Sequence, residues 1–372
     1  MKARKLLIGI AALGLATTLA ACSGGRGGAG TEAEPGSNDG ALVGIAMPTQ
    51  SSERWIDDGN NVVSQLEELG YETDLQYAND DIPTQVSQIE NMIAQGAKAL
   101  IVASIDGTTL TDVLESAASQ GIPVIAYDRL INGTENVDYY ASFDNFRVGV
   151  QQGTSLLTGL GVLDAEGNET GEAGPYNVEL FAGSNDDNNA TFFWDGAMSV
   201  LEPYLEDGTL VVPSGQTEFE QASILRWLPE NAQDRMENLV TAGGGAQLDG
   251  VLSAADVLSV GIIAGLNSSG QYNADNFPIV TGQDADLGAV KSILAGEQYS
   301  TIFKDTRELA TVAVEMVDAL LNGEEPETNN DTDYDNGEKV VPAFLLDPVV
   351  VTADNITEVL VDSGYYTEDE LQ

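Results

Sequence analysis

The stretch that decides the fold is Val124-Ile125-Ala126-Tyr127-Asp128-Arg129-Leu130. Its first four residues are apolar, and an acid and a base follow at once. This order is typical of a buried parallel strand whose carboxyl end meets a ligand crevice. Polar or aromatic groups follow a predicted strand in the same way at Ser51-Ser52-Glu53-Arg54-Trp55 and at Thr281-Gly282-Gln283-Asp284-Ala285-Asp286. Together the three stretches predict a site for a small polyhydroxylated molecule.

Strand-like and helix-like segments alternate on both sides of this stretch. The first series predicts strands at 41–47, 71–77, 99–103, 124–128 and 137–143, with helices at 54–70, 81–96 and 109–121. The second predicts strands at 177–182, 210–213, 249–253 and 279–281, with helices at 146–160, 189–205, 229–242, 257–266 and 289–295. A strand at 299–304, a helix at 308–321, strands within 340–351 and a helix at 355–363 complete the pattern. The alternation predicts an α/β fold with two lobes, each a parallel sheet with helices on both faces.

The chain is strongly acidic. It has 60 Asp and Glu against 14 Lys and Arg, which gives a formal net charge of -46. A polyanion repels nucleic acid and anionic lipid headgroups, so we expect neither as a partner of the protein body. The 42% of hydrophobic residues, arranged in periodic blocks, argues against disorder. The acidity indicates either a surface adapted to high salt or a surface that has drifted towards Asp and Glu for solubility.

Two residue counts exclude further chemistry. The absence of His removes His-based acid/base catalysis, His-dependent triads and most zinc sites. The single Cys rules out an internal disulfide. The acidic loop 329–338 imitates a calcium-binding loop, but Gly337 comes one place late and Pro342 stands where a bidentate Glu is needed. We therefore expect no metal and no cofactor.

The N-terminus has the pattern of a secretory signal. Three cations at Lys2, Arg4 and Lys5 precede an apolar run over residues 6–21 that is short for a membrane span. Its end, Leu19-Ala20-Ala21-Cys22-Ser23-Gly24, resembles the bacterial lipoprotein cleavage box, in which the Cys is lipidated. The alternative is a plain signal with an incidental Cys. The pattern predicts a leader at 1–21, a lipid on Cys22, a flexible linker at 22–40, and a location on the extracytoplasmic face of the cell membrane.

Eight short motifs together resemble one family, the extracytoplasmic sugar receptors of ABC importers, which are type I periplasmic binding proteins. Within that family the resemblance is to receptors for xylose and for multiple sugars. It covers 41–361 in order. The motifs are Ser51-Ser52-Glu53-Arg54-Trp55, Gln88-Ile89-Glu90-Asn91-Met92-Ile93, Ala126-Tyr127-Asp128-Arg129, Ser142-Phe143-Asp144-Asn145, Asp187-Asn188-Asn189-Ala190, Trp227-Leu228-Pro229-Glu230-Asn231-Ala232, Gly282-Gln283-Asp284-Ala285-Asp286 and Phe303-Lys304.

The resemblance implies two Rossmann-like lobes joined by three crossover strands that close on a sugar. One lobe would comprise 41–144 plus 306–344 and the other 147–304 plus 347–372, with crossings near Asn145, Asp305 and Leu346. It further implies a monomer that captures a monosaccharide of the xylose, glucose, galactose or arabinose type. The sugar would pass to an ABC permease, and a membrane sensor kinase is an alternative or additional partner.

The same resemblance implies which residues contact the sugar, and their chemistry agrees with that role. Carboxylates accept bonds from sugar hydroxyls, cations and amides donate them, and indole rings cover the apolar C–H faces of a pyranose. The expected sugar-binding residues are Arg54, Trp55, Asp128, Arg129, Asn189, Trp227, Asp284 and Lys304.

Several of these residues have a structural alternative. Trp55 also fits the inner face of its helix, and Trp227 could be a hydrophobic staple before Pro229. Asp128 and Arg129 could form only a salt bridge with each other at the strand end. Asn189 and Asp284 could be ordinary cap or turn residues.

One position departs from the family pattern. Ala255 stands where xylose-type receptors carry a sugar-binding Asn, which puts the choice of sugar in doubt. A secreted glycosidase with paired carboxylates is the enzymatic alternative to a receptor. We expect no catalytic residues, because the predicted site carboxylates each lie beside cations or amides, which disfavours a carboxylic acid of raised pKa.

Overall fold

The computed structural model describes residues 38, 40–243 and 247–372. The predicted leader 1–21, Cys22 and all but two residues of the predicted linker 22–40 lie outside the described residues. Within the described ranges, no helix has the length and apolar character that crossing a membrane requires.

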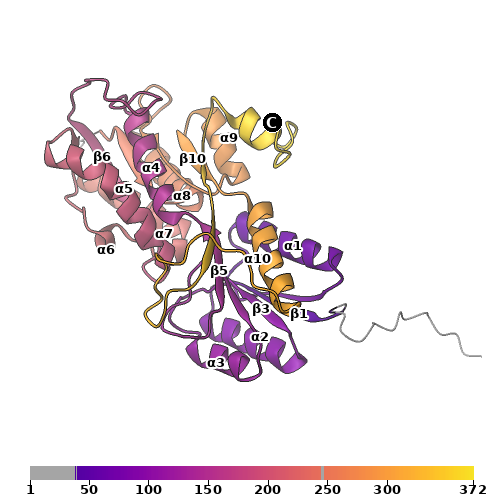
Figure 1. Ribbon diagram of the computed structural model, residues 1–372. Helices are drawn as coiled ribbons and strands as arrows, with labels where there is room; N and C mark the ends of the chain where they lie inside the picture. The colour runs from indigo at the N-terminus through magenta and orange to yellow at the C-terminus, as the bar shows by residue number, and fades with distance from the viewer. Residues whose placement is uncertain (1–37, 39, 244–246) are drawn as a thin grey trace, which may run out of the picture. The chain divides into compact units, whose positions relative to one another are not determined.

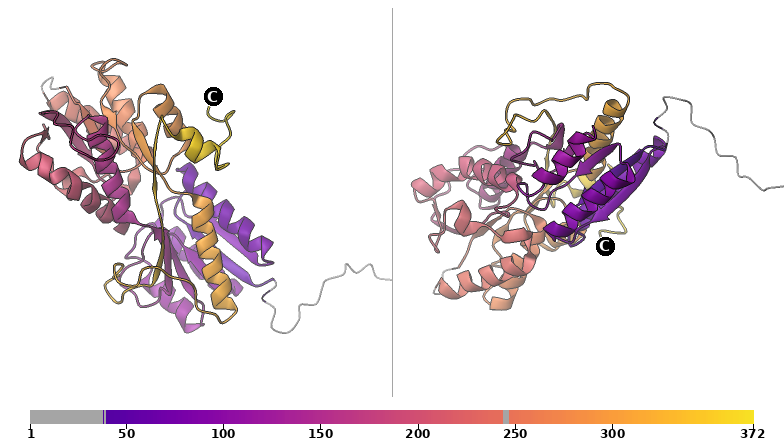
Figure 2. Two further views of the ribbon diagram at one scale, coloured as in Figure 1. Left: turned by 45° about the horizontal axis from the view of Figure 1, so that its top comes forward. Right: turned by 90° about the horizontal axis from the view of Figure 1, so that it is seen from below.

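The first sheet contains six parallel strands in the order β11-β5-β4-β3-β1-β2 (Figure 1). Helices α1 and α10 cover one face of this sheet, and α2 and α3 cover the other. Successive strand residues such as Leu100 and Ile101 point to opposite faces and therefore belong to different core clusters. Figure 2 shows α10 beside the indigo strands and α1. The elements are β1 (Leu42–Met47), α1 (Glu53–Glu68), β2 (Glu72–Tyr77), α2 (Ile82–Gln95), β3 (Ala99–Val102), α3 (Thr111–Ser119), β4 (Val124–Tyr127), β5 (Tyr139–Phe143), α10 (Thr306–Leu321) and β11 (Ala343–Leu346).

The second sheet contains four parallel strands in the order β7-β6-β8-β9. Helices α4 and α5 pack on one face, and α7 and α8 pack on the other. Strands β10 and β12 form an antiparallel pair beside it. The elements are α4 (Asn145–Gly159), β6 (Tyr176–Phe181), α5 (Asn188–Glu206), β7 (Leu210–Val211), α7 (Pro229–Ala242), β8 (Gly250–Ser253), α8 (Asp256–Ser269), β9 (Ile279–Val280), α9 (Leu287–Ala295), β10 (Ser300–Phe303) and β12 (Val349–Thr352).

The chain passes between these two groups of elements at three places. Strand β5 of the first sheet leads through Asp144 into α4, and β10 leads through Asp305 back to α10. Strand β11 leads through Asp347-Pro348 to β12. The first two passages end in capped helices, because the carboxylates of Asp144 and Asp305 each accept a backbone N–H bond of 3.0 Å in the first helical turn.

The predicted fold class, α/β with parallel sheets in two groups, is confirmed. The sequence pattern did not predict two short elements, α6 (Phe219–Ala222) and the 3₁₀ turn η1 (Leu225–Trp227). The helix expected at 355–363 is instead a π-helical segment, η2 (Thr357–Val361). In the acidic loop 329–338, the buried Asn336 donates bonds to the carbonyl oxygens of Ile131 (3.1 Å) and Thr134 (2.8 Å), which connect this loop to the segment between β4 and β5.

Close packing of α4 against α5 depends on Gly149. A Cβ there would lie 2.0 Å from the Phe193 carbonyl oxygen and 2.8 Å from the Ala197 nitrogen. These are backbone atoms that no side-chain rotation can move. We expect Gly149→Ala to lower the free energy of unfolding by about 1–3 kcal/mol, the usual cost of overpacking, in urea denaturation.

The matched control for this prediction is Gly288→Ala in α9, where a Cβ meets nothing within 4 Å. There the better helix propensity of Ala should leave stability unchanged or raise it by up to ~1 kcal/mol. Equal unfolding midpoints for the two variants would show that the two helices can separate at no cost.

Candidate functional site

The structure brings all eight predicted site residues into one pocket, which holds about 660 Å³ of empty space, part of it open to solvent. They come from the start of α1, the ends of β4, β9 and β10, the start of α5, and η1. The pocket is also lined by Thr49, Ser51, Ser52, Asp80, Ile105, Asp186, Asp187, Phe193, Arg226, Ala255, Val257 and Gln283.

Arg54 is the centre of a buried cluster of charges. Its guanidinium pairs with Asp128, lies 3.3 Å from an oxygen of Asp58, and lies 3.3 Å from an oxygen of Asp284. The Lys304 ammonium adds a 2.9 Å bond to Asp284. Only 6% of Arg54 and 3% of Asp128 are exposed. Burial raises the pKa of Asp128, but Arg54 and Lys304 outweigh that effect and lower the pKa to about 2.

Asp58 lies behind this cluster and is fully buried. The Tyr127 hydroxyl donates a 2.5 Å bond to one of its oxygens. Burial raises the pKa of Asp58 to about 7, although Arg54 opposes the shift. Near neutral pH the Asp58 carboxyl is therefore partly protonated, which brings the cluster closer to neutrality.

This shift predicts how stability depends on pH. The folded-state pKa of Asp58 lies above the usual value near 4, so the folded protein holds a proton that the unfolded chain releases. The group contributes its full stability below about pH 4 and loses it as the pH rises through 7, by up to about 1.4 kcal/mol per pH unit. Asp58→Asn should remove this loss, so its stability relative to the wild type should rise between pH 5 and pH 8.

Urea denaturation of the ligand-free protein at pH 5, 6, 7 and 8 measures this difference. The control is Asp331→Asn, because Asp331 is exposed. The free energy of unfolding of Asp331→Asn, plotted against pH, should stay parallel to that of the wild type. A parallel curve for Asp58→Asn as well would mean that Asp58 does not hold the proton.

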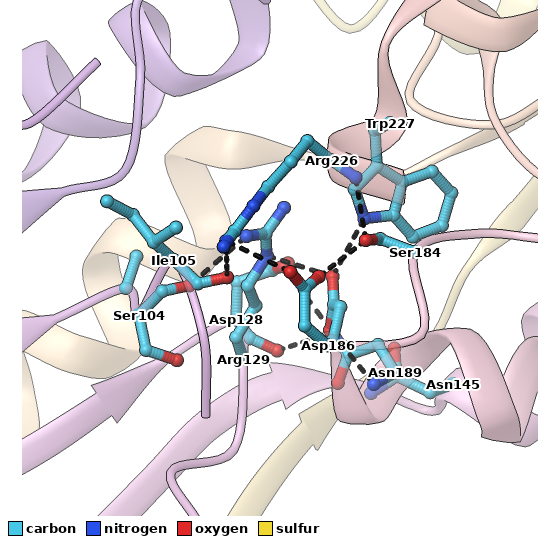
Figure 3. A network of polar contacts seen from close by, with 12 residues as sticks. Ser104, Ile105, Asp128, Arg129, Asn145, Ser184, Asp186, Asn189, Arg226 and Trp227 are labelled. Atoms are coloured by element: carbon cyan, nitrogen blue, oxygen red, sulfur yellow. Dashed lines mark hydrogen bonds and ion pairs between the residues drawn. The ribbon is translucent and has the colours of Figure 1, made fainter. Parts of the chain in front are cut away.

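The backbone at Asp128 has the unusual φ of 58°. Three side chains donate to its carbonyl oxygen: Tyr140 (2.6 Å), Ser142 (2.9 Å) and Asn189 (2.7 Å). The labelled side chains of Asp128 and Asn189 are seen in Figure 3. Every described non-glycine residue with positive φ lies in the pocket or next to a pocket residue: Asn79, Asp80, Asp128, Arg226, Trp227, Asp284 and Ala285. Strain of this kind concentrates where a fold must aim side chains at a ligand.

Arg129 pairs with Asp187, not with its neighbour Asp128. Its Nε lies 2.9 Å from Asp187 Oδ2, and its Nη1 donates to the Ser104 carbonyl oxygen (3.1 Å). The alternative of an adjacent Asp128–Arg129 salt bridge is therefore wrong. The guanidinium also lies 5.0 Å from the centroid of the Trp55 ring.

The two indole rings have different surroundings. Trp55 belongs to the core cluster beneath α1 and also lines the pocket. Its structural and ligand-facing interpretations are therefore both compatible with its position. Trp227 Nε1 donates to Asp187 (3.1 Å). A Cβ at Gly183 would lie 2.0 Å from the Trp227 ring, so this glycine provides the space for the ring. Trp227 thus lines the pocket and also packs against the core cluster that contains Ala232 and Met236 of α7, so its ligand-facing and staple interpretations are both compatible with its position.

Four charged pocket residues were not predicted from the sequence as sugar contacts: Asp80, Asp186, Asp187 and Arg226. Arg226 Nη1 lies 3.0 Å from Asp186 and donates to the Ile105 carbonyl oxygen (3.3 Å), as Figure 3 shows. The available signal was a cation beside Trp227 in a chain with only 14 Lys and Arg.

This arrangement is suited to a neutral polar ligand. Each pocket cation is paired with at least one carboxylate, so the pocket offers donors and acceptors without a strong excess of either charge. Aromatic rings supply apolar faces beside them. Across the described chain, no group of three or more Cys, Asp or Glu side chains is placed to hold a metal ion.

Comparison with known proteins identifies close relatives. A family model described as a periplasmic binding protein domain matches residues 43–325. The multiple sugar-binding periplasmic receptor of Rhizobium radiobacter is 56% identical over 90% of this chain and 93% of its own length. The D-xylose-binding periplasmic protein of Escherichia coli is 37% identical over 88% of this chain and 92% of its own length.

A solved structure is similarly close. The ABC transporter solute-binding protein of Clostridium phytofermentans, crystallised with bound β-D-glucose, is 48% identical. Its TM-score is 0.84, over 89% of this chain and all of that chain.

Proposed function

The chain belongs to the periplasmic binding protein family, and on that premise we propose that it is an extracytoplasmic receptor for a monosaccharide that it delivers to an ABC permease. One observation carries the proposal: the eight residues chosen for sugar contact, two of which carry indole rings, line a single pocket. The lobes that close on the sugar would be 41–144 with 306–344 and 147–304 with 347–372.

In this proposal each site residue has a role towards a pyranose that follows from its chemistry. Asp128 and Asp284 accept bonds from hydroxyl groups, and Arg54, Arg129, Lys304 and Asn189 donate them. The charged partners make these bonds stronger than neutral ones. Trp55 and Trp227 cover the apolar faces of the ring.

A glycosidase is disfavoured by the state of these carboxylates. An acid catalyst needs a raised pKa, whereas the pKa of Asp128 is lowered to about 2. Burial raises the pKa of two other pocket carboxyls, Asp80 and Asp187, but the Arg129 cation opposes both shifts. The two carboxyls with a pKa near 7, Asp58 and Asp286, do not line the pocket. The relatives are sugar-binding receptors and not enzymes.

The relatives favour an aldose bound as a pyranose, with glucose and xylose as the leading candidates. Receptors 56% and 37% identical are named for multiple sugars and for D-xylose, and a solved relative holds β-D-glucose. Ala255 lines the pocket with a methyl group and rejects no hydroxyl configuration by hydrogen bonding. We therefore propose that more than one aldose binds.

A thermal-shift and calorimetric screen tests this function. The ligands are D-glucose, D-galactose, D-xylose, L-arabinose and D-ribose, applied to residues 38–372. At a hundredfold excess over Kd, a ligand specific for the folded state stabilises the protein by ~2.7 kcal/mol. No shift with any of these sugars at millimolar concentration would refute the sugar proposal.

We also propose that a lipid on Cys22 holds the receptor at the membrane through the linker 22–40. Cys22→Ser should release the protein into the soluble fraction while its sugar affinity stays unchanged, because Cys22 is not one of the residues proposed to contact the sugar. The matched control is Ser23→Ala, which keeps the Cys and should remain with the membrane. Cell fractionation and calorimetry measure the two effects, and membrane retention of Cys22→Ser would contradict the anchor.

A further inference from the structure

Gln283 lies in the pocket wall, and the sequence analysis did not choose it for sugar contact. It follows β9 and precedes Asp284, and only 2% of its surface is exposed. Its backbone oxygen accepts a 2.9 Å bond from the nitrogen of Asp256. This bond places Gln283 beside the turn at Ala255 that begins α8.

The side-chain amide of Gln283 is incompletely satisfied. Its Oε1 is buried and has no hydrogen-bond partner. Among the described pocket residues, the other two atoms in this condition are the Nε atoms of Arg54 and Arg129, and both of these lie in ion pairs. Gln283 Oε1 therefore differs from these two atoms, because it is a buried polar atom with neither a hydrogen-bond partner nor an ion-pair partner. Such an atom costs free energy unless something bonds to it.

The surroundings explain why a ligand is the natural partner. Ala255 and Val257, which also line the pocket near the start of α8, have purely apolar side chains. Asp284, the next residue along the chain, is held by Arg54 and Lys304. A hydroxyl group that meets this wall can find an uncommitted hydrogen-bonding group in the Gln283 amide, and a hydroxyl can both donate and accept.

We propose that Gln283 determines sugar specificity by hydrogen-bonding one particular hydroxyl of the bound aldose. This inference rests on the proposed function of the pocket. It assigns one ring position of the sugar to the wall formed by Gln283 and Ala255. Sugars that lack a hydroxyl at that position would leave the amide unpaired and bind more weakly.

Calorimetry with a set of deoxy sugars tests the proposal. The probes are D-glucose and its 2-, 3-, 4- and 6-deoxy derivatives. The variant is Gln283→Met, which keeps the length of the side chain and removes its hydrogen-bonding atoms. We expect the variant to lose about tenfold to a hundredfold in affinity for D-glucose, as for one buried hydrogen bond.

One deoxy sugar should behave differently from the rest. It should bind the wild type more weakly than D-glucose by a similar factor, yet bind Gln283→Met about as well as D-glucose does. Each of the other derivatives should bind more weakly than D-glucose by the same factor in the wild type and in Gln283→Met. This pattern is a coupling between one side chain and one hydroxyl.

The control is Gln88→Met. Gln88 also has a buried Oε1 without a partner but lies outside the pocket. The affinity of Gln88→Met for every probe should equal that of the wild type. The role of Gln283 would be overturned if the affinity loss caused by Gln283→Met and the loss caused by each deoxy substitution simply add for all four deoxy sugars. It would also be overturned if Gln283→Met binds D-glucose as tightly as the wild type does. Failure of the wild type to bind any sugar would instead overturn the function itself.

Discussion

Asp128→Ala is expected to lower sugar affinity by roughly a hundredfold or more, a loss on the order of 2–5 kcal/mol. The carboxylate is held ionised, with a pKa of about 2, by Arg54 and Lys304. Its removal takes away charge-assisted acceptors for sugar hydroxyls. It also leaves the buried Arg54 without its Asp128 partner. Isothermal titration with D-glucose or D-xylose measures the loss.

The structure also changes what this variant should do to folding. A solvated ion pair at a strand end would contribute little to the stability of the empty protein. Asp128 is instead only 3% exposed, so Asp128→Ala should destabilise the ligand-free protein as well. Titrations must therefore be made well below its unfolding temperature. The exposed control Asp331→Ala should match the wild type in both affinity and stability. Equal sugar affinity in the two variants would contradict the role of Asp128.

Arg54→Met is expected to lower the free energy of unfolding of the ligand-free protein by about 3–5 kcal/mol at neutral pH. The change leaves the carboxylates of Asp58, Asp128 and Asp284 facing one another in a buried cluster, with Lys304 and the more distant Arg129 left to offset them. An uncompensated buried charge is among the most destabilising defects that a single substitution can create. Sugar binding should be lost with it.

The pH dependence of this defect provides a second test. Without Arg54, the folded-state pKa values of Asp58 and Asp128 should rise, so the folded variant binds protons that the unfolded chain releases. Stability that depends on such protons is lost as the pH rises. The deficit of Arg54→Met relative to the wild type should therefore be smaller at pH 5 than at pH 8.

Arg147→Met is the matched control, because it removes an Arg–Asp pair at the surface. The side chains of Arg147 and Asp347 are 51% and 81% exposed. Such pairs contribute at most about 1 kcal/mol, so the control should unfold close to the wild type at both pH values. A comparable loss for the two Arg variants would mean that the Arg54 cluster is hydrated.

The amino-acid sequence determined the elements and the candidate positions of the site. The alternation of apolar segments predicted the parallel strands and most helices, because burial on both faces requires continuous apolar strands and regularly spaced helix residues. It also marked the strand ends, and carboxyl ends of parallel strands meet at one edge of a sheet. All eight predicted residues accordingly line one pocket. The turn at Leu225–Trp227 escaped prediction, because Arg226 and Trp227 have positive φ, which their residue types do not signal.

Only the tertiary structure decided which charges pair and which groups remain free. Arg54 meets Asp128 and Asp284, which lie 74 and 230 residues away along the chain, and Arg129 bypasses its neighbour to reach Asp187. The buried state of Asp58 and the unpartnered amide oxygen of Gln283 are likewise invisible in sequence. The physical reason is that pairing and desolvation depend on distances of a few ångströms between side chains from distant elements. The hydrophobic pattern specifies which face of an element is buried, but not which distant side chain it will meet there.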